Sequence, residues 1–174
     1  MDTWVNLLFG YLFGSIPVGL VVGYAFTGKD IRLYGSGKTG VTNVLRTAGK
    51  LPAALVLIGD VSKGLLPAVI GRYIFEDDLA AAVGAAMAVC GHIWPVFAGF
   101  RGGRGVATAF GGVLGLTPLI GAGLPILAAL IVLPTRYVSL MSILGTPIAA
   151  GIVVAAAIAG REPAEFAWYA VVAA

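Results

Sequence analysis

Residues 79–98 read LAAAVGAAMAVCGHIWPVFA, a run of twenty positions without an aspartate, glutamate, lysine or arginine. An α-helix rises about 1.5 Å per residue, so this run is long enough to cross the roughly 30 Å hydrocarbon core of a bilayer. The rest of the chain is similar: 59% of its 174 residues are hydrophobic, 11% are charged, and the mean hydropathy is +0.99. Soluble domains carry about 25% charged residues. We therefore expect an all-α polytopic membrane protein whose residues 1–174 form a single domain.

Further apolar runs raise the expected number of transmembrane helices to about seven. A proline inside a helix removes a hydrogen bond and clashes with the preceding turn, so the long run after residue 105 is predicted to split near Thr117-Pro118. The last run, which Pro163 opens and Ala174 ends, covers only about 15 Å of helix. We expect this final helix to be incomplete and the natural protein to continue. The other predicted runs are about 4–26, 51–75, 106–133 (two short helices) and 137–159.

The charged residues predict how the chain is oriented in the membrane. Cations gather between the first two runs, whereas Glu76, Asp77 and Asp78 form an acidic turn after the second run. Loops rich in lysine and arginine face the cytoplasm, so the N-terminus is predicted to lie outside. The cations expected inside are Lys29, Arg32, Lys38, Arg46, Lys50, Arg101, Arg104 and Arg136.

Two glycine-rich basic loops interrupt the apolar sequence on this predicted inner face: GSGKTGVTNVLR at 35–46 and FRGGRGVAT at 100–108. Glycines let backbone N–H groups converge on one point, and a nearby guanidinium or ammonium adds full charge, a combination that suits phosphate oxygens. The second loop also leads into a helix N-terminus, which attracts anions. We therefore predict binding of phosphorylated small molecules where water meets lipid. The candidate residues are Gly35, Ser36, Gly37, Lys38, Thr42, Asn43, Arg46, Gly102, Gly103, Arg104 and Gly105.

Several other classes of site are disfavoured. Gly37-Lys38-Thr39 resembles part of a nucleotide-binding P-loop, but Arg32 stands where that pattern requires its first glycine, and no buried strand precedes it. One histidine and one cysteine are too few for a metal cluster, so no metal is expected. No basic face with stacking aromatics lies outside the two loops, so nucleic acid is not expected as a partner.

Three titratable residues inside the apolar runs have two interpretations each. Asp60 and Lys63 are spaced to share one face of a helix, where they either form a structural ion pair or line a polar cleft beneath the loops. His92, the only histidine, either orients its helix or forms part of the active-site wall. Lys63 and His92 are therefore kept as candidate substrate-binding residues.

In these stretches the sequence resembles the bacterial acyl-phosphate:glycerol-3-phosphate acyltransferase family (PlsY). The matching segments are residues 35–46 above, GDVSKG at 59–64 and GHIWPVFAGFRGGRGVAT at 91–108. The resemblance implies a multi-pass enzyme of the bacterial cytoplasmic (inner) membrane. Its reaction would transfer a fatty acyl group from acyl phosphate to glycerol 3-phosphate, giving 1-acylglycerol 3-phosphate and phosphate. That reaction is the first acylation of bacterial phospholipid synthesis.

The resemblance also implies roles for individual residues. The first family motif places its functional serine and arginine at Ser36 and Arg46, and the second, a glycerol-3-phosphate-binding motif, falls on the glycines at 102, 103 and 105 with Arg104 beside them. Lys38 and Arg104 depart from the family, which usually has asparagine and lysine there. A third motif, with a functional histidine and asparagine, has no counterpart before Ala174.

Acyl phosphate is already activated, so no cofactor, nucleotide, coenzyme A or covalent enzyme intermediate is needed. The expected partners are both substrates, membrane lipid and the phosphate acyltransferase that forms acyl phosphate. Catalysis would rest on proximity and electrostatics, with a substrate phosphate oxygen as the candidate proton acceptor. An organic-phosphate transporter is the main alternative, although the predicted outer half lacks matching basic loops, and a non-catalytic scaffold is the third interpretation.

Overall fold

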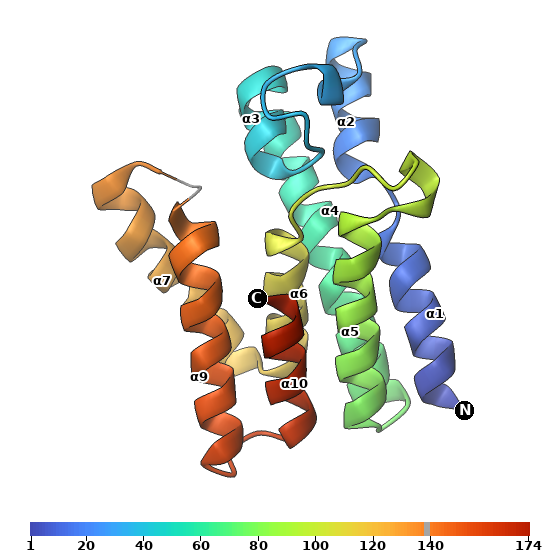
Figure 1. Ribbon diagram of the computed structural model, residues 1–174, viewed down its shortest axis with the longest axis vertical. Helices are drawn as coiled ribbons and strands as arrows, with labels where there is room; N and C mark the ends of the chain where they lie inside the picture. The colour runs from blue at the N-terminus through green and yellow to red at the C-terminus, as the bar shows by residue number, and fades with distance from the viewer. Residues whose placement is uncertain (138–139) are drawn as a thin grey trace.

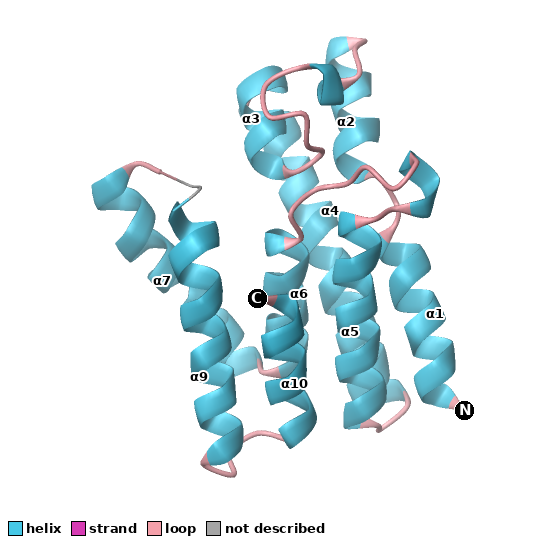
Figure 2. Ribbon diagram, in the orientation of Figure 1, coloured by secondary structure: helices cyan, strands magenta, loops and turns pink. Residues whose placement is uncertain are grey.

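The structure is a computed structural model that describes residues 1–137 and 140–174, and it is helical throughout, with no strand in these ranges (Figures 1 and 2). The α-helices are α1 (Asp2–Gly14), α2 (Val18–Thr27), α3 (Val41–Ala48), α4 (Lys50–Val69), α5 (Asp78–Ile93), α6 (Val106–Leu116), α7 (Pro118–Thr135), α9 (Thr146–Ile158) and α10 (Ala164–Ala173). Four shorter helical segments accompany them: η1 (Ile31–Leu33), η2 (Ile70–Ile74), η3 (Val96–Ala98) and η4 (Met141–Gly145).

Within residues 1–137 and 140–174, four helical stretches are long and apolar enough to cross a membrane, and three shorter apolar helices join them. The long stretches are Asp2–Thr27, Lys50–Ile74, Asp78–Ala98 and Pro118–Thr135, and the shorter ones are Val106–Leu116, Ile143–Ile158 and Ala164–Ala173. Together they match the predicted seven helices, so the chain is an integral, multi-pass membrane protein. The predicted split near residue 117 is confirmed, because α6 ends at Leu116 and α7 begins at Pro118.

The first predicted run, however, is two helices and not one. The helix stops at Gly14, and α2 starts only at Val18. Pro17 has no backbone N–H to continue the helical ladder. Ser15 also donates its hydroxyl hydrogen to the carbonyl oxygen of Tyr11 at 2.8 Å. The break allows α1 to pack along α5 while α2 lies beside α3 and α4 (Figure 1).

Small residues let the helices approach one another closely. A Cβ atom at Gly64 on α4 would overlap the carbonyl oxygen of Thr108 on α6, and one at Gly111 would overlap the carbonyl oxygen of Val61. Membrane helices associate through such small-residue contacts, because lipid provides no hydrophobic force between helices. The contact between α4 and α6 brings the start of α6, and the glycine loop before it, onto the bundle formed by α4 and α5 (Figure 1).

Both glycine loops lie at the same end of the bundle. In Figure 1, the segment between α2 and α3 and the segment between α5 and α6 meet at the top of α4 and α5. The acidic turn before α5 and the turn between α9 and α10 lie at the opposite end. The charge pattern in the sequence had placed these segments on the same two sides, and the helix directions agree with it.

Candidate active site

The first loop is built around the side chain of Asn43, which is 2% exposed. Its Oδ1 accepts from the backbone N–H of Ser36 at 2.9 Å, and its Nδ2 donates to the carbonyl oxygens of Ile31 at 3.0 Å and Lys38 at 2.8 Å. One amide at the start of α3 therefore fixes three points of the loop. Gly35 has φ +59°, and a Cβ there would overlap Asn43 Oδ1, so the curve of the loop requires glycine.

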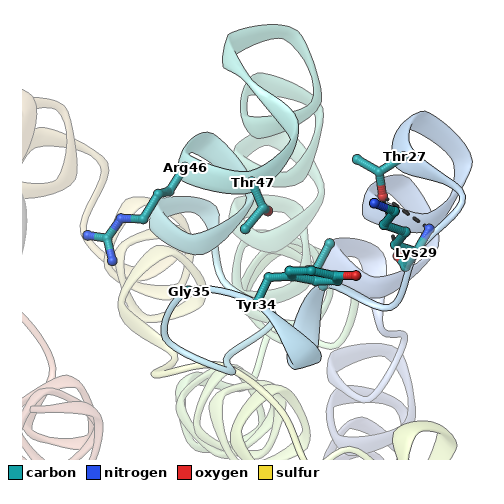
Figure 3. Close-up of a pocket in the computed structure, with 7 residues that line it drawn as sticks. Thr27, Lys29, Tyr34, Gly35, Arg46 and Thr47 are labelled. Carbon is teal, nitrogen blue, oxygen red and sulfur yellow. Dashed lines mark hydrogen bonds between the residues drawn. The ribbon is translucent and has the colours of Figure 1, made fainter.

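A cavity of about 420 Å³ opens beside this loop. Figure 3 shows Arg46 extending away from Thr27 and Lys29, which lie beyond the ring of Tyr34. The ammonium of Lys29 lies 5.7 Å from the centroid of that ring, a cation–π arrangement. The residues that line the cavity are Thr27, Lys29, Ile31, Tyr34, Gly35, Arg46 and Thr47. This end of the first loop therefore combines a free guanidinium with an exposed glycine turn.

The second loop folds back over the end of α5. Gly102 donates its N–H to the carbonyl oxygen of Ile93, and Gly103 donates to that of His92, both at 3.2 Å. Gly105 has φ +81° and caps α6, so the first amides of α6 face the loop. Gly102, Gly103 and Gly105 are buried, whereas Arg104 is exposed. The glycines thus seat the loop on α5 and leave its cation free to meet a ligand.

Arg32 links the two short helical segments that precede these loops, η1 and η3. Its guanidinium pairs with Asp30 at 2.8 Å, and Nη1 donates to the carbonyl oxygen of Ala98 at 3.1 Å. The side-chain hydrogen bonds from Arg32, with a backbone bond from the same residue, hold the pKa of Asp30 below its usual range. A second cavity of about 530 Å³ lies at this junction, lined by Leu20, Arg32, Phe97, Ala98, Gly99 and Arg101. The sequence analysis counted Arg32 only among the cations expected inside and did not predict this link.

The structural ion pair predicted between Asp60 and Lys63 is present. Nζ of Lys63 donates to Oδ1 of Asp60 at 2.8 Å, and the two side chains are 3% and 2% exposed. Nδ1 of His92 lies 3.4 Å from the same carboxylate oxygen. Lys63 and His92 therefore lie beneath the loops and inside the bundle, and neither lines the two cavities described above.

The remaining predicted residues divide by exposure. The exposed set, which a ligand can reach from solvent, is Gly35, Ser36, Gly37, Lys38, Thr42, Arg46 and Arg104. The buried set, which shapes the loops, is Asn43, Gly102, Gly103 and Gly105. The polar atoms of Asn43 are engaged within the loop itself. Asn43 is thus seen to hold the loop in shape, and its contact with substrate stays a prediction.

The family model described as glycerol-3-phosphate acyltransferase matches residues 4–174. The chain belongs to this family. A glycerol-3-phosphate acyltransferase of Rubrobacter xylanophilus is 44% identical over 140 residues, which cover 80% of this chain and 70% of the relative. One of Francisella tularensis subsp. holarctica is 44% identical over 143 residues, covering 82% and 70%.

Solved structures agree with this family assignment. The crystal structure of PlsY, an integral membrane glycerol 3-phosphate acyltransferase, in its glycerol 3-phosphate form matches with a TM-score of 0.90 at 36% identity. The match covers 99% of this chain and 84% of that one. The lysophosphatidic acid form of PlsY matches with a TM-score of 0.87. The chain is thus an acyltransferase of this family, and the comparisons favour acyl transfer over transport of organic phosphates.

Proposed function

We propose that the chain transfers a fatty acyl group from acyl phosphate to glycerol 3-phosphate at a site formed by the loops at 35–46 and 100–108. The observation that carries this proposal is the meeting of two glycine-rich cationic loops at one end of the bundle (Figure 1). The bond from Arg32 to Ala98 links the segments just before these loops. Two phosphorylated substrates repel each other, and two sets of cations and amides offset that repulsion.

Arg46 and Arg104 each neutralise one phosphate in this proposal, and Ser36 with the loop amides completes the site. The hydroxyl oxygen of glycerol 3-phosphate attacks the acyl carbon, the bond from that carbon to the phosphate oxygen breaks, and phosphate leaves. The hydroxyl proton passes to a phosphate oxygen. The enzyme then contributes orientation and charge, which are large terms when both reactants are held in place.

The proposal includes the location and orientation of the chain in the membrane. Residues 1–174 act as one domain in the bacterial inner membrane, with the N-terminus outside and both loops cytoplasmic, in agreement with the excess of cations at the loop end. The acyl chain lies between helices while its phosphate stays at the loops. The phosphate acyltransferase that makes acyl phosphate is the partner that would supply the donor.

The decisive assay uses purified protein with acyl phosphate and labelled glycerol 3-phosphate. Losing a charged hydrogen-bond donor to a phosphate costs about 1.5–3 kcal/mol, so Arg46→Ala and Arg104→Ala should each lower kcat/KM by roughly 10- to 100-fold. Lys50→Ala is the matched control, because Lys50 is an exposed cation at the start of α4 and outside both loops. It should stay within about twofold of wild type.

Three results would contradict the proposal. Wild-type protein that forms no lysophosphatidic acid from these substrates would refute the reaction itself. An equal loss in Lys50→Ala and Arg46→Ala would show a general dependence on surface charge. A trapped acyl group on Ser36 would replace direct transfer with a covalent route.

A further inference from the structure

Three titratable side chains form a cluster inside the bundle, directly beneath the second loop. Lys63 Nζ lies 2.8 Å and His92 Nδ1 lies 3.4 Å from the same oxygen, Oδ1 of Asp60. All three side chains are between 2% and 5% exposed. Charged groups are costly to bury within a membrane protein, and a buried ion pair is weak evidence of stabilisation. This cluster therefore calls for a role beyond holding the helices together.

His92 connects the cluster to the loop. Its backbone carbonyl oxygen accepts from Gly103 N–H, and the next carbonyl, that of Ile93, accepts from Gly102 N–H, both at 3.2 Å. Its ring lies under Gly103 so closely that a Cβ atom at Gly103 would overlap Nε2. One ring nitrogen thus faces Asp60, and the other lies beneath the loop.

His92 approaches Asp60 through Nδ1. Nδ1 is buried and has no hydrogen-bond partner within residues 1–137 and 140–174, although Asp60 Oδ1 is within ion-pair distance. The same ring carries Nε2, which a Cβ atom at Gly103 would overlap. The position of the loop and the contact with Asp60 are therefore coupled through one rigid ring.

We propose that Asp60 is a positioning residue for acyl transfer, acting through His92 on the Gly102–Arg104 segment. Asp60 fixes the ring, the ring supports Gly103, and the loop then presents Arg104 and the first amides of α6 to the phosphate of glycerol 3-phosphate. Lys63 balances the buried charge. This inference rests on the proposed assignment of the second loop to glycerol 3-phosphate. Asp60 itself touches no substrate.

The experiment measures KM separately for each substrate in three variants. Asp60→Asn removes the carboxylate but leaves Lys63 buried without its counter-charge, whereas Asp60→Asn/Lys63→Met removes both charges at similar volume. Misplacing a binding group by about 1 Å can cost roughly 100-fold, so we expect both to raise the KM for glycerol 3-phosphate at least about tenfold. The KM for acyl phosphate should stay within about twofold. Asp77→Asn, at the opposite end, is the control and should leave both KM values unchanged.

The double variant separates positioning from charge balance. If it restores the wild-type KM for glycerol 3-phosphate, Asp60 serves only to neutralise Lys63, and the proposal is wrong. Equal increases in both KM values would also overturn it, because a general loss of structure does not distinguish the substrates. A wild type that makes no product would refute the proposed function instead, whereas an active wild type with unchanged Asp60 variants refutes only this inference.

A second test covers the case in which Asp60→Asn does not fold. Gly103→Ala should raise the KM for glycerol 3-phosphate, since its Cβ displaces the loop from the ring. If the ring and the loop act as one unit, the double variant Gly103→Ala/His92→Ala should have a KM for glycerol 3-phosphate no higher than that of the worse single variant. Losses that multiply would mean that the two residues act independently, which would contradict the proposal.

Discussion

At the residue scale, the shape of the first loop depends on two residues in contact with each other: the buried side-chain amide of Asn43 and the glycine at position 35. Asn43 holds three backbone groups, and Gly35 adopts a left-handed φ of +59°. The sequence had marked both residues as part of a phosphate loop. The sequence could not show which of them contacts a ligand and which holds the loop in shape, because that depends on the direction of each side chain in the folded loop.

Gly35→Ala tests this arrangement, with Gly40→Ala as the matched control. The left-handed conformation costs a residue with a Cβ about 1–2 kcal/mol, and here the Cβ also overlaps Asn43 Oδ1. We expect at least about a tenfold loss of acyl transfer. Gly40 has φ −77°, and a Cβ there would meet nothing within 4 Å, so Gly40→Ala should keep near-wild-type activity. Equal activity in the two variants would show that the loop tolerates another shape.

At the element scale, the contact between α4 and α6 places the second loop. Gly64 lets the backbones of these helices touch, and Lys63, its neighbour, belongs to the buried cluster. Small residues at helical spacing also permit the close approach on α6, where a Cβ atom at Gly111 or Gly115 would overlap atoms of α4. Which pair of helices would meet could not be read from the spacing, because apolar runs of similar composition fit several partners.

Gly64→Ala should destabilise the protein by roughly 1–3 kcal/mol, because its Cβ overlaps the carbonyl oxygen of Thr108 and forces α4 and α6 apart. Gly123→Ala on α7 is the control. Position 123 is exposed with open space around it, so an alanine there should be neutral or stabilising by about 0.5–1 kcal/mol. Thermal unfolding in detergent measures both. Identical melting temperatures for the two variants would mean that the helices do not need this close approach.

The bridge between the loops should respond to pH through Asp30. The bonds from Arg32 lower its folded-state pKa, so its stabilising effect is complete above the unfolded carboxyl pKa of about 4 and is lost as the pH falls through the lower folded value. Asp30→Asn keeps an acceptor for Arg32 N–H but removes the charge. Both partners are about one-third exposed, so the melting temperature should fall by at most about 2–4 °C.

This difference should be constant from pH 8 to about pH 5 and shrink below about pH 4. Melting curves of wild type and Asp30→Asn across this range test it. A difference that grows as the pH falls would have the wrong sign for a carboxylate with a lowered pKa.

At the scale of the whole molecule, two segments far apart in the chain meet at one end of the bundle (Figure 1). The sequence predicted their shared side from charge, and it predicted the split between α6 and α7 from Thr117-Pro118. It missed the break at Pro17, which lies within an unbroken apolar run, and the bond from Arg32 to Ala98, which joins residues 66 positions apart. Features set by neighbouring residues could be predicted from the sequence, whereas contacts between distant residues could not, because they form only in the folded bundle.

Amide hydrogen exchange of the protein in lipid nanodiscs tests most directly whether the two loops form one site. With glycerol 3-phosphate and an uncleavable acyl-phosphate analogue present together, exchange should slow in both the 35–46 and the 100–108 loops, while exchange in the acidic turn at 76–78 stays unchanged. Protection of only one loop, or of neither, would contradict a shared site.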